Sequence, residues 1–153
     1  MTEPTAGATS SGQGAEPTAQ PVRRDRHAIG LEMLQAVDGR EGQAVVAALA
    51  EICPDFARYL VEFPFGDIYA RSGLDLRSRE IATIAALTTL GHARPQLEVH
   101  VAAGLNVGLS REEIIEIVMQ MAVYAGFPAA INGLVAAQAV FERHAAAAEE
   151  GAR

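Results

Sequence analysis

The chain has 153 residues, of which half are hydrophobic and a fifth are charged, and its formal net charge is −7 at pH 7. This length suits a single domain. The net negative charge argues against a nucleic-acid surface, which needs clustered Lys and Arg. A small anionic substrate is still compatible with the net charge. Tryptophan is absent and aromatic residues make up 5% of the chain, a composition typical of closely packed helices.

The only cysteine is Cys53, so an internal disulfide and a CxxC redox or zinc site are both excluded. Because Cys53 stands between Ile52 and Pro54, we expect a small buried apolar residue rather than a catalytic thiol. No stretch reaches the ~18 uncharged apolar residues of a membrane span. The N-terminus also lacks the basic and apolar regions of a signal peptide, so we expect a cytoplasmic protein with no membrane partner.

The composition divides the chain into three parts. Residues 1–22 are rich in Thr, Ser, Gly, Pro, Ala and Gln and hold almost no large apolar side chain, which predicts a disordered N-terminal tail. Residues 23–147 form the predicted helical domain, and residues 148–153 form a C-terminal tail.

Apolar residues recur at helical spacing from His27 onward, and no segment shows strand alternation. Pro64 and Gly66 are expected to interrupt the third helix, and Ser110 with Glu113 forms a capping box that opens the sixth. The fold class is therefore all-α, with six or seven helices joined by short loops. The predicted helices cover residues 27–39, 41–52, 55–63, 76–90, 95–108, 110–126 and 128–147.

Two polar side chains stand on apolar helix faces. Glu80 shares a stripe with Ile84 at the entrance of an uncharged helix, so it either pairs with Arg77 or Arg79 near the helix N-terminus or belongs to a site. His100 has only apolar or small helix neighbours, including Ala103 and Gly104. It is therefore either a hydrogen-bonded core residue or part of a cleft, and the two small residues indicate either a close helix crossing or room for a ligand.

The segment "GHARPQLEVH" holds His92, Glu98 and His100, but it does not predict a metal site. Glu98 and His100 are two residues apart, about 200° around a helix, so they face opposite sides. His92 lies near the end of the preceding helix, where a histidine can interact with the helix dipole. Tyr124, at a later helix junction, is either a packing residue or a hydrogen-bond donor to a substrate.

The runs "GLDLRSREIATIAALTTLG" and "LEVHVAAGLNVGLSREEIIEIVMQMAVYAGFPAAINGL" resemble the carboxymuconolactone decarboxylase family, part of the alkylhydroperoxidase D-like superfamily. The resemblance covers about residues 30–143. It implies an all-helical bundle that assembles as a homo-trimer or homo-hexamer, with sites near the subunit contacts.

The peroxidase branch of that superfamily carries a glutamate, eleven residues, C-x-x-C and then a histidine. Compared with this pattern, Glu80 matches the glutamate, His92 and Pro95 stand where the cysteines would be, and His100 lies within one residue of the histidine. Thiol peroxidase chemistry is excluded, because no side chain at those positions forms a thiolate.

The branch without the cysteines implies loss of CO₂ from a small carboxylated substrate, 4-carboxymuconolactone, in aromatic catabolism, with no metal or organic cofactor. On this resemblance His100 is the general acid/base, Glu80 assists it, and His92 is a third catalytic candidate. Leu87, Leu97 and Val107 are expected to form an apolar wall beside the substrate. The candidates for substrate binding are Arg77, Arg79, Arg94 and Tyr124.

Two other functions stay open at this point. The same scaffold could carry an isomerase or a ring-opening enzyme of secondary metabolism, or it could be a non-catalytic oligomeric binding protein. Turnover of a carboxylated lactone that depends on His100 and Glu80 would favour the lyase, whereas a His100 sealed in a core would favour the binding protein.

Overall fold

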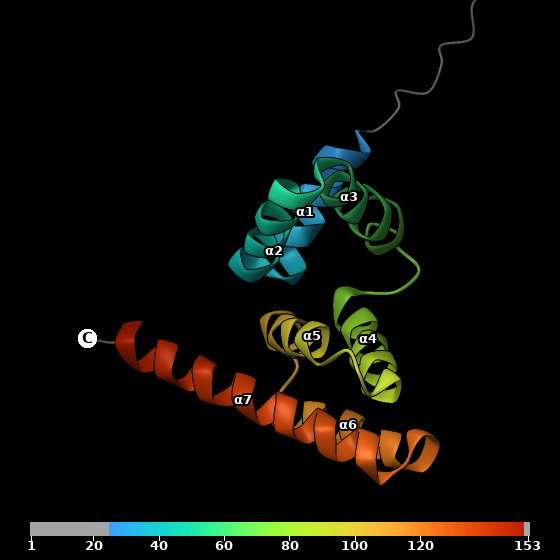
Figure 1. The fold of residues 1–153 in the computed structure, drawn as a ribbon, viewed down its shortest axis with the longest axis vertical. Coiled ribbons are helices and arrows are strands. Elements are labelled where there is room, and N and C mark those ends of the chain that lie inside the picture. The colour runs from blue at the N-terminus through green and yellow to red at the C-terminus, as the bar shows by residue number, and fades with distance from the viewer. Residues whose placement is uncertain (1–24, 152–153) are drawn as a thin grey trace, which may run out of the picture.

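The computed structural model describes residues 25–151, and over this range the chain is entirely helical, which confirms the all-α prediction (Figure 1). Seven α-helices and one π-helix follow one another without a strand in this part of the chain. Their bounds are α1 Arg26–Val37, α2 Gly39–Ile52, α3 Pro54–Leu60, η1 Val61–Tyr69, α4 Leu76–Leu90, α5 Arg94–Asn106, α6 Arg111–Ala125 and α7 Phe127–Gly151.

Local capping explains where several helices begin and end. The side chain of Asp75 accepts a 2.7 Å hydrogen bond from the Ser78 N–H at the start of α4. The predicted capping box is present at α6, where Glu113 N–H donates to Ser110 Oγ and the Glu113 side chain accepts from the Ser110 N–H. Gly91 ends α4 in the left-handed region, with a φ of 72° that favours glycine.

The predicted break at Pro64 is wrong, because the chain continues from α3 into η1 through that proline. Proline lacks an N–H and its ring clashes with an α-helical carbonyl four residues back, and the wider π-turn relieves this conflict. Ala70 N–H accordingly donates to the Phe65 carbonyl, five residues earlier. Close packing holds η1 against α1: a Cβ added at Gly66 would lie 2.4 Å from the Arg26 carbonyl oxygen.

The helices form two groups that meet at α5 (Figure 1). The first group comprises α1, α2, α3 and η1, with a core that includes Leu34, Val61 and Phe65. The second comprises α4 to α7, with a core that includes Ile84 and Ile114. Ala103 of α5 belongs to the core of the first group, so α5 holds the two together.

Small residues in the second group serve close packing. A Cβ added at Gly104 would lie 3.1 Å from Ile84 Cδ1, and one added at Gly133 would lie 2.8 Å from Val118 Cγ1. Gly104, which the sequence left open between a helix crossing and ligand space, is therefore a packing residue.

Both ends of the chain bear on the domain prediction. The predicted tail at residues 1–22 lies outside the described residues. At the other end α7 continues to Gly151, so residues 148–151 of the expected C-terminal tail are helical (Figure 1). No helix within residues 25–151 combines the length and the apolarity needed to cross a membrane.

The expectation for Cys53 is wrong, because this residue is exposed. It stands in an extended conformation at the corner between α2 and α3, and its neighbour Ile52 is 82% exposed. The apolar neighbours of Cys53 in the sequence do not reveal this exposure.

Candidate active site

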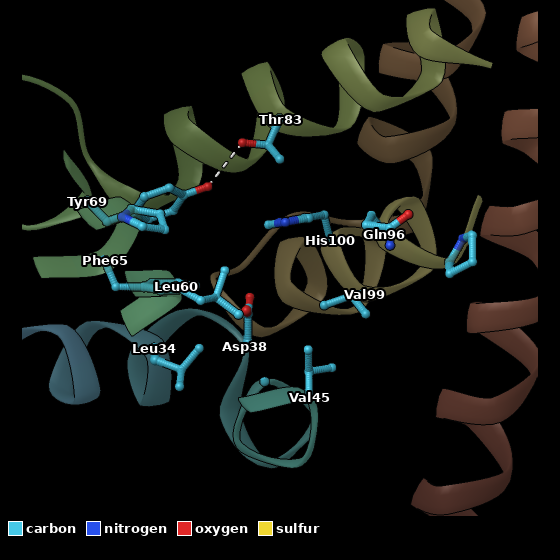
Figure 2. Close-up of a pocket in the computed structure, with 13 residues that line it drawn as sticks. Leu34, Asp38, Val45, Leu60, Phe65, Tyr69, Thr83, Gln96, Val99 and His100 are labelled. Carbon is cyan, nitrogen blue, oxygen red and sulfur yellow. Dashed lines mark hydrogen bonds between the residues drawn. The ribbon is translucent and has the colours of Figure 1, made fainter. Parts of the chain in front are cut away.

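A cavity of about 440 Å³ lies between the two groups of helices (Figure 2). Its first side comes from α1, α2, α3 and η1, and its second side from α4 and α5. Such a volume suits a small organic molecule. The lining residues are Leu34, Asp38, Gly42, Val45, Leu60, Pro64, Phe65, Tyr69, Thr83, Pro95, Gln96, Val99 and His100.

Glu80 lies directly behind the cavity with its side chain 0% exposed. Its Oε2 is 2.9 Å from His100 Nδ1, and its Oε1 accepts a 2.8 Å hydrogen bond from the Tyr69 hydroxyl. A buried carboxylate needs such partners to offset the loss of hydration. The pairing with Arg77 or Arg79 that the sequence left open is not the one formed.

His100 projects from α5 into the cavity (Figure 2). Its Nδ1 is held by Glu80, and within the described residues its Nε2 has no hydrogen-bond partner. Burial disfavours the imidazolium, but the hydrogen bond with Glu80 and the charges of Glu80 and Asp38 outweigh it, so the pKa of His100 is raised. The site therefore stabilises a protonated imidazole that presents one free N–H to a ligand.

Tyr69 was missed by the sequence analysis and connects η1 to α4. Its hydroxyl lies 3.0 Å from Thr83 Oγ1 (Figure 2). The same hydroxyl lies 2.8 Å from Glu80 Oε1, and the Thr83 hydroxyl donates to the Arg79 carbonyl. Burial and then the charge of Glu80 raise the pKa of Tyr69 well above its usual value. Tyr69 therefore remains a neutral phenol that holds Glu80 in place.

Asp38 was also missed, and it faces His100 from the junction of α1 and α2 (Figure 2). Burial, opposed by the charge of His100, raises the pKa of Asp38 to about 6. The sequence signal was weak, because an Asp before Gly39 at a helix boundary has the pattern of an ordinary turn or cap.

Three arginines were predicted to bind a substrate carboxylate, and none of them lines the cavity. Arg77 pairs with Glu113, and Arg94 pairs with Glu98 at 2.8 Å. Arg79 donates to the Arg71 carbonyl and places its guanidinium over the Tyr69 ring.

His92 and Tyr124 lie away from the cavity. His92 is exposed, with Nδ1 2.8 Å from the Leu90 carbonyl oxygen at the end of α4, the helix-end position considered from the sequence. Tyr124 is 75% exposed near the end of α6. Their predicted roles stay predictions, and the side chains that the fold brings together are Glu80, His100, Tyr69 and Asp38.

The apolar wall differs from the expected one, because none of Leu87, Leu97 and Val107 lines the cavity. The wall comes instead from Leu34, Val45, Leu60, Pro64 and Phe65 of the first helix group. Periodicity shows which face of a helix is apolar, but it does not show which distant element packs against that face.

Glu98 and His100 face opposite ways, as the helical geometry predicts. Glu98 accepts hydrogen bonds from Arg94 and from Arg143 of α7, whereas His100 binds Glu80. Within residues 25–151 no three His, Cys, Asp or Glu side chains are grouped as metal ligands.

The sequence profile of the carboxymuconolactone decarboxylase family matches residues 54–139. The chain belongs to this family. Glu80 and His100 both lie within the matched family region, whereas Asp38 precedes it.

Three relatives are similar to this chain, and two of them are named as decarboxylases. The 4-carboxymuconolactone decarboxylase of Acinetobacter baylyi is 30% identical over 118 residues, which cover 76% of this chain and 87% of that protein. An uncharacterised 15.0 kDa protein of Paracoccus denitrificans is 34% identical over 113 residues, 73% of this chain and 84% of its own length. The nitrosuccinic acid decarboxylase of Metarhizium robertsii is 31% identical over 80 residues, 52% of this chain and 54% of that enzyme.

Proposed function

We propose that this protein is a cofactor-independent decarboxylase that acts on a small carboxylated lactone of the 4-carboxymuconolactone type. One observation carries the proposal: His100 is held by a fully buried Glu80 at the edge of a largely apolar cavity, with its second ring nitrogen free for a ligand. Two relatives named as decarboxylases, at 30% and 31% identity, support the same reaction class.

The proposed reaction needs one proton and a place for the electrons that CO₂ leaves behind. The bond between the ring carbon and the carboxylate breaks, CO₂ departs, and its electron pair enters the conjugated system of the unsaturated lactone. His100 then donates its Nε2 proton to a carbon of that system and regains a proton from solvent. Glu80 stabilises the imidazolium and fixes the ring, and the apolar wall favours the change from a carboxylate to neutral CO₂.

We also propose that the protein works as a homo-trimer or homo-hexamer. Large apolar side chains stand exposed around the junction of α6 and α7, where Val123, Tyr124 and Phe127 are each about three-quarters exposed or more. An apolar patch of this kind is typical of a surface that another subunit covers.

Isomerisation is the second candidate, because Asp38 and His100 face one cavity from different elements. Two such groups can remove a proton from one carbon and return it to another. Product analysis separates the two functions, since only the lyase releases CO₂.

The test is CO₂ release from carboxylated butenolides, 4-carboxymuconolactone among them, by the full chain and three variants. We expect His100→Ala and Glu80→Gln to lower kcat by roughly 10²-fold or more, the usual contribution of a positioned acid. Because the pKa of His100 is raised, kcat should be highest where the imidazolium persists and fall as the pH rises through that pKa. The matched control is His144→Ala at an exposed histidine of α7 that has no proposed role, which should leave kcat unchanged. Turnover that survives both site variants would overturn the assignment.

A further inference from the structure

Asp38 occupies a capping position but does not cap. It precedes α2, where an aspartate ordinarily accepts a hydrogen bond from an N–H of the first turn. Its side chain makes no such bond, and its Oδ1 is buried without a hydrogen-bond partner within the described residues. The carboxyl group instead points into the cavity that His100 also faces (Figure 2).

The surrounding structure holds Asp38 in this orientation. One turn along α2, a Cβ added at Gly42 would lie 2.4 Å from Asp38 Cβ and 3.1 Å from Oδ2, so only glycine leaves room for the side chain. From the other side, Asn106 Nδ2 donates to the Ala36 and Val37 carbonyls at 3.1 and 2.8 Å. Asn106 and His100 both belong to α5, and Ala36 and Val37 directly precede Asp38. These two bonds therefore fix the backbone before Asp38 relative to the imidazole across the cavity.

The charges around Asp38 constrain what the cavity can hold. The charged groups that act on Asp38 are His100 of α5, Glu80 of α4 and Glu41 of α2, so the only cation among them is the imidazolium. No Lys or Arg is among the cavity-lining residues of the described chain. One substrate carboxylate can be offset by His100, but a second would lie near Asp38 without a counter-charge, and unpaired like charges in a partly buried site are costly.

We propose that Asp38 determines the substrate class of this site, admitting lactones with one carboxylate and a neutral hydrogen-bond donor and discriminating against dicarboxylates. This inference rests on the proposed decarboxylase function. The donor, a hydroxyl or an enol, bonds to the Asp38 carboxylate where that group lines the cavity, while His100 offsets the charge of the single carboxylate. The preferred substrate is therefore less charged than 4-carboxymuconolactone, which carries two carboxylates.

Two matched lactones test this at pH 7.5. The first is 4-carboxymuconolactone, and the second keeps its ring and ring carboxylate but replaces the CH₂–CO₂⁻ arm with a CH₂–CH₂–OH arm. We expect the wild-type chain to bind the hydroxyethyl lactone at least ~10-fold more tightly in calorimetry and to show the same preference in kcat/KM. Asp38→Asn should reduce this ratio to about 1–2, mainly by tightening the binding of the dicarboxylate. The amide keeps the shape of the aspartate side chain and removes its negative charge.

The control variant is Glu51→Gln, which removes an exposed carboxylate at the far end of α2 and should leave the ratio unchanged. The role of Asp38 would be overturned if the wild-type chain preferred the dicarboxylate. It would also be overturned if Asp38→Asn kept the same ratio as the wild-type chain. If the expected binding ratio appears without CO₂ release, the reaction class is wrong and the role of Asp38 stands. If neither lactone binds, both proposals are wrong.

Discussion

Glu80 has both carboxyl oxygens engaged by side chains of the cavity, and this determines what His100 can do. A buried carboxyl group needs hydrogen-bond partners to offset the loss of hydration, and Tyr69 and His100 supply one for each oxygen. The pair also leaves one imidazole nitrogen directed to the ligand, so orientation and protonation of His100 have the same structural cause.

Burial of the Asp38 carboxylate reduces the stability of the folded chain, and this predicts a pH-dependent effect of Asp38→Asn. The folded-state pKa of Asp38, about 6, lies above the usual carboxyl value of 3.8, so its contribution to the stability of the folded chain is lost as the pH rises through 6. The amide has no charge to bury, so the variant should be more stable than wild type near pH 7.5 by on the order of 2 kcal/mol, with less than half of that near pH 4.5. Urea unfolding followed by far-ultraviolet circular dichroism measures this, and a variant less stable than wild type at pH 7.5 would contradict it.

At this scale the sequence predicted the Glu80–His100 pair better than the rest of the site. A charged or titratable residue on an otherwise apolar helix face stands out in one sequence, and both residues did. Asp38 did not stand out, because an aspartate before a helix has the same sequence pattern whether or not its side chain caps that helix. Tyr69 did not either, since its role depends on η1 lying beside α4, a contact between distant segments.

The helices themselves were largely predictable because their ends depend on neighbouring residues. Ser110 with Glu113, Asp75 and Gly91 determine their boundaries through bonds and backbone angles within a few positions. η1 is the exception, since the continuation of the chain through Pro64 depends on how it packs against α1. Where a helix packs against a segment that is distant in the sequence, the local effect of proline does not determine where the helix ends.

The contact between α1 and η1 gives a prediction for Gly30. A Cβ added there would lie 2.3 Å from the Val61 carbonyl oxygen, and backbone of another helix cannot move aside cheaply. Gly30→Ala should therefore destabilise the fold by about 2 kcal/mol or more, even though alanine favours helix formation. Gly73→Ala, where an added Cβ meets nothing within 4 Å, is the control and should change stability by less than about 0.5 kcal/mol. Denaturant unfolding of both variants measures the difference, and equal effects would show that the close contact is not maintained.

On the scale of the whole molecule, the cavity is formed where two helix groups meet, and neither group encloses it alone. The first supplies most of the apolar wall and Asp38, and the second supplies His100 with Glu80 behind it. α5 contributes to both, so a movement of one group against the other would change the separation of Asp38 and His100.

The exposed side chains at the α6–α7 junction give a prediction about assembly. Val123 is 78% exposed and Phe127 74% exposed, and burying them between subunits would remove apolar area from water. We expect the wild-type chain to have the mass of a trimer or hexamer in size-exclusion chromatography with light scattering, and Val123→Glu to shift it toward monomer. Leu74→Glu, at another exposed apolar position, should keep the wild-type mass. A monomeric wild type would contradict the proposed assembly.

The division of the cavity between two stretches of chain has a consequence for how this scaffold can change. The Glu80–His100 pair lies inside the region that matches the family profile, whereas Leu34, Asp38, Gly42 and Val45 precede it. If the proposed function holds, the acid–base pair and the part of the lining that contains Asp38 are encoded in separate stretches, although Leu60, Pro64 and Phe65 of the wall lie inside the matched region. Diversifying α1 and α2 alone should yield catalysts with altered selectivity and an unaltered acid–base pair, a practical starting point for directed evolution.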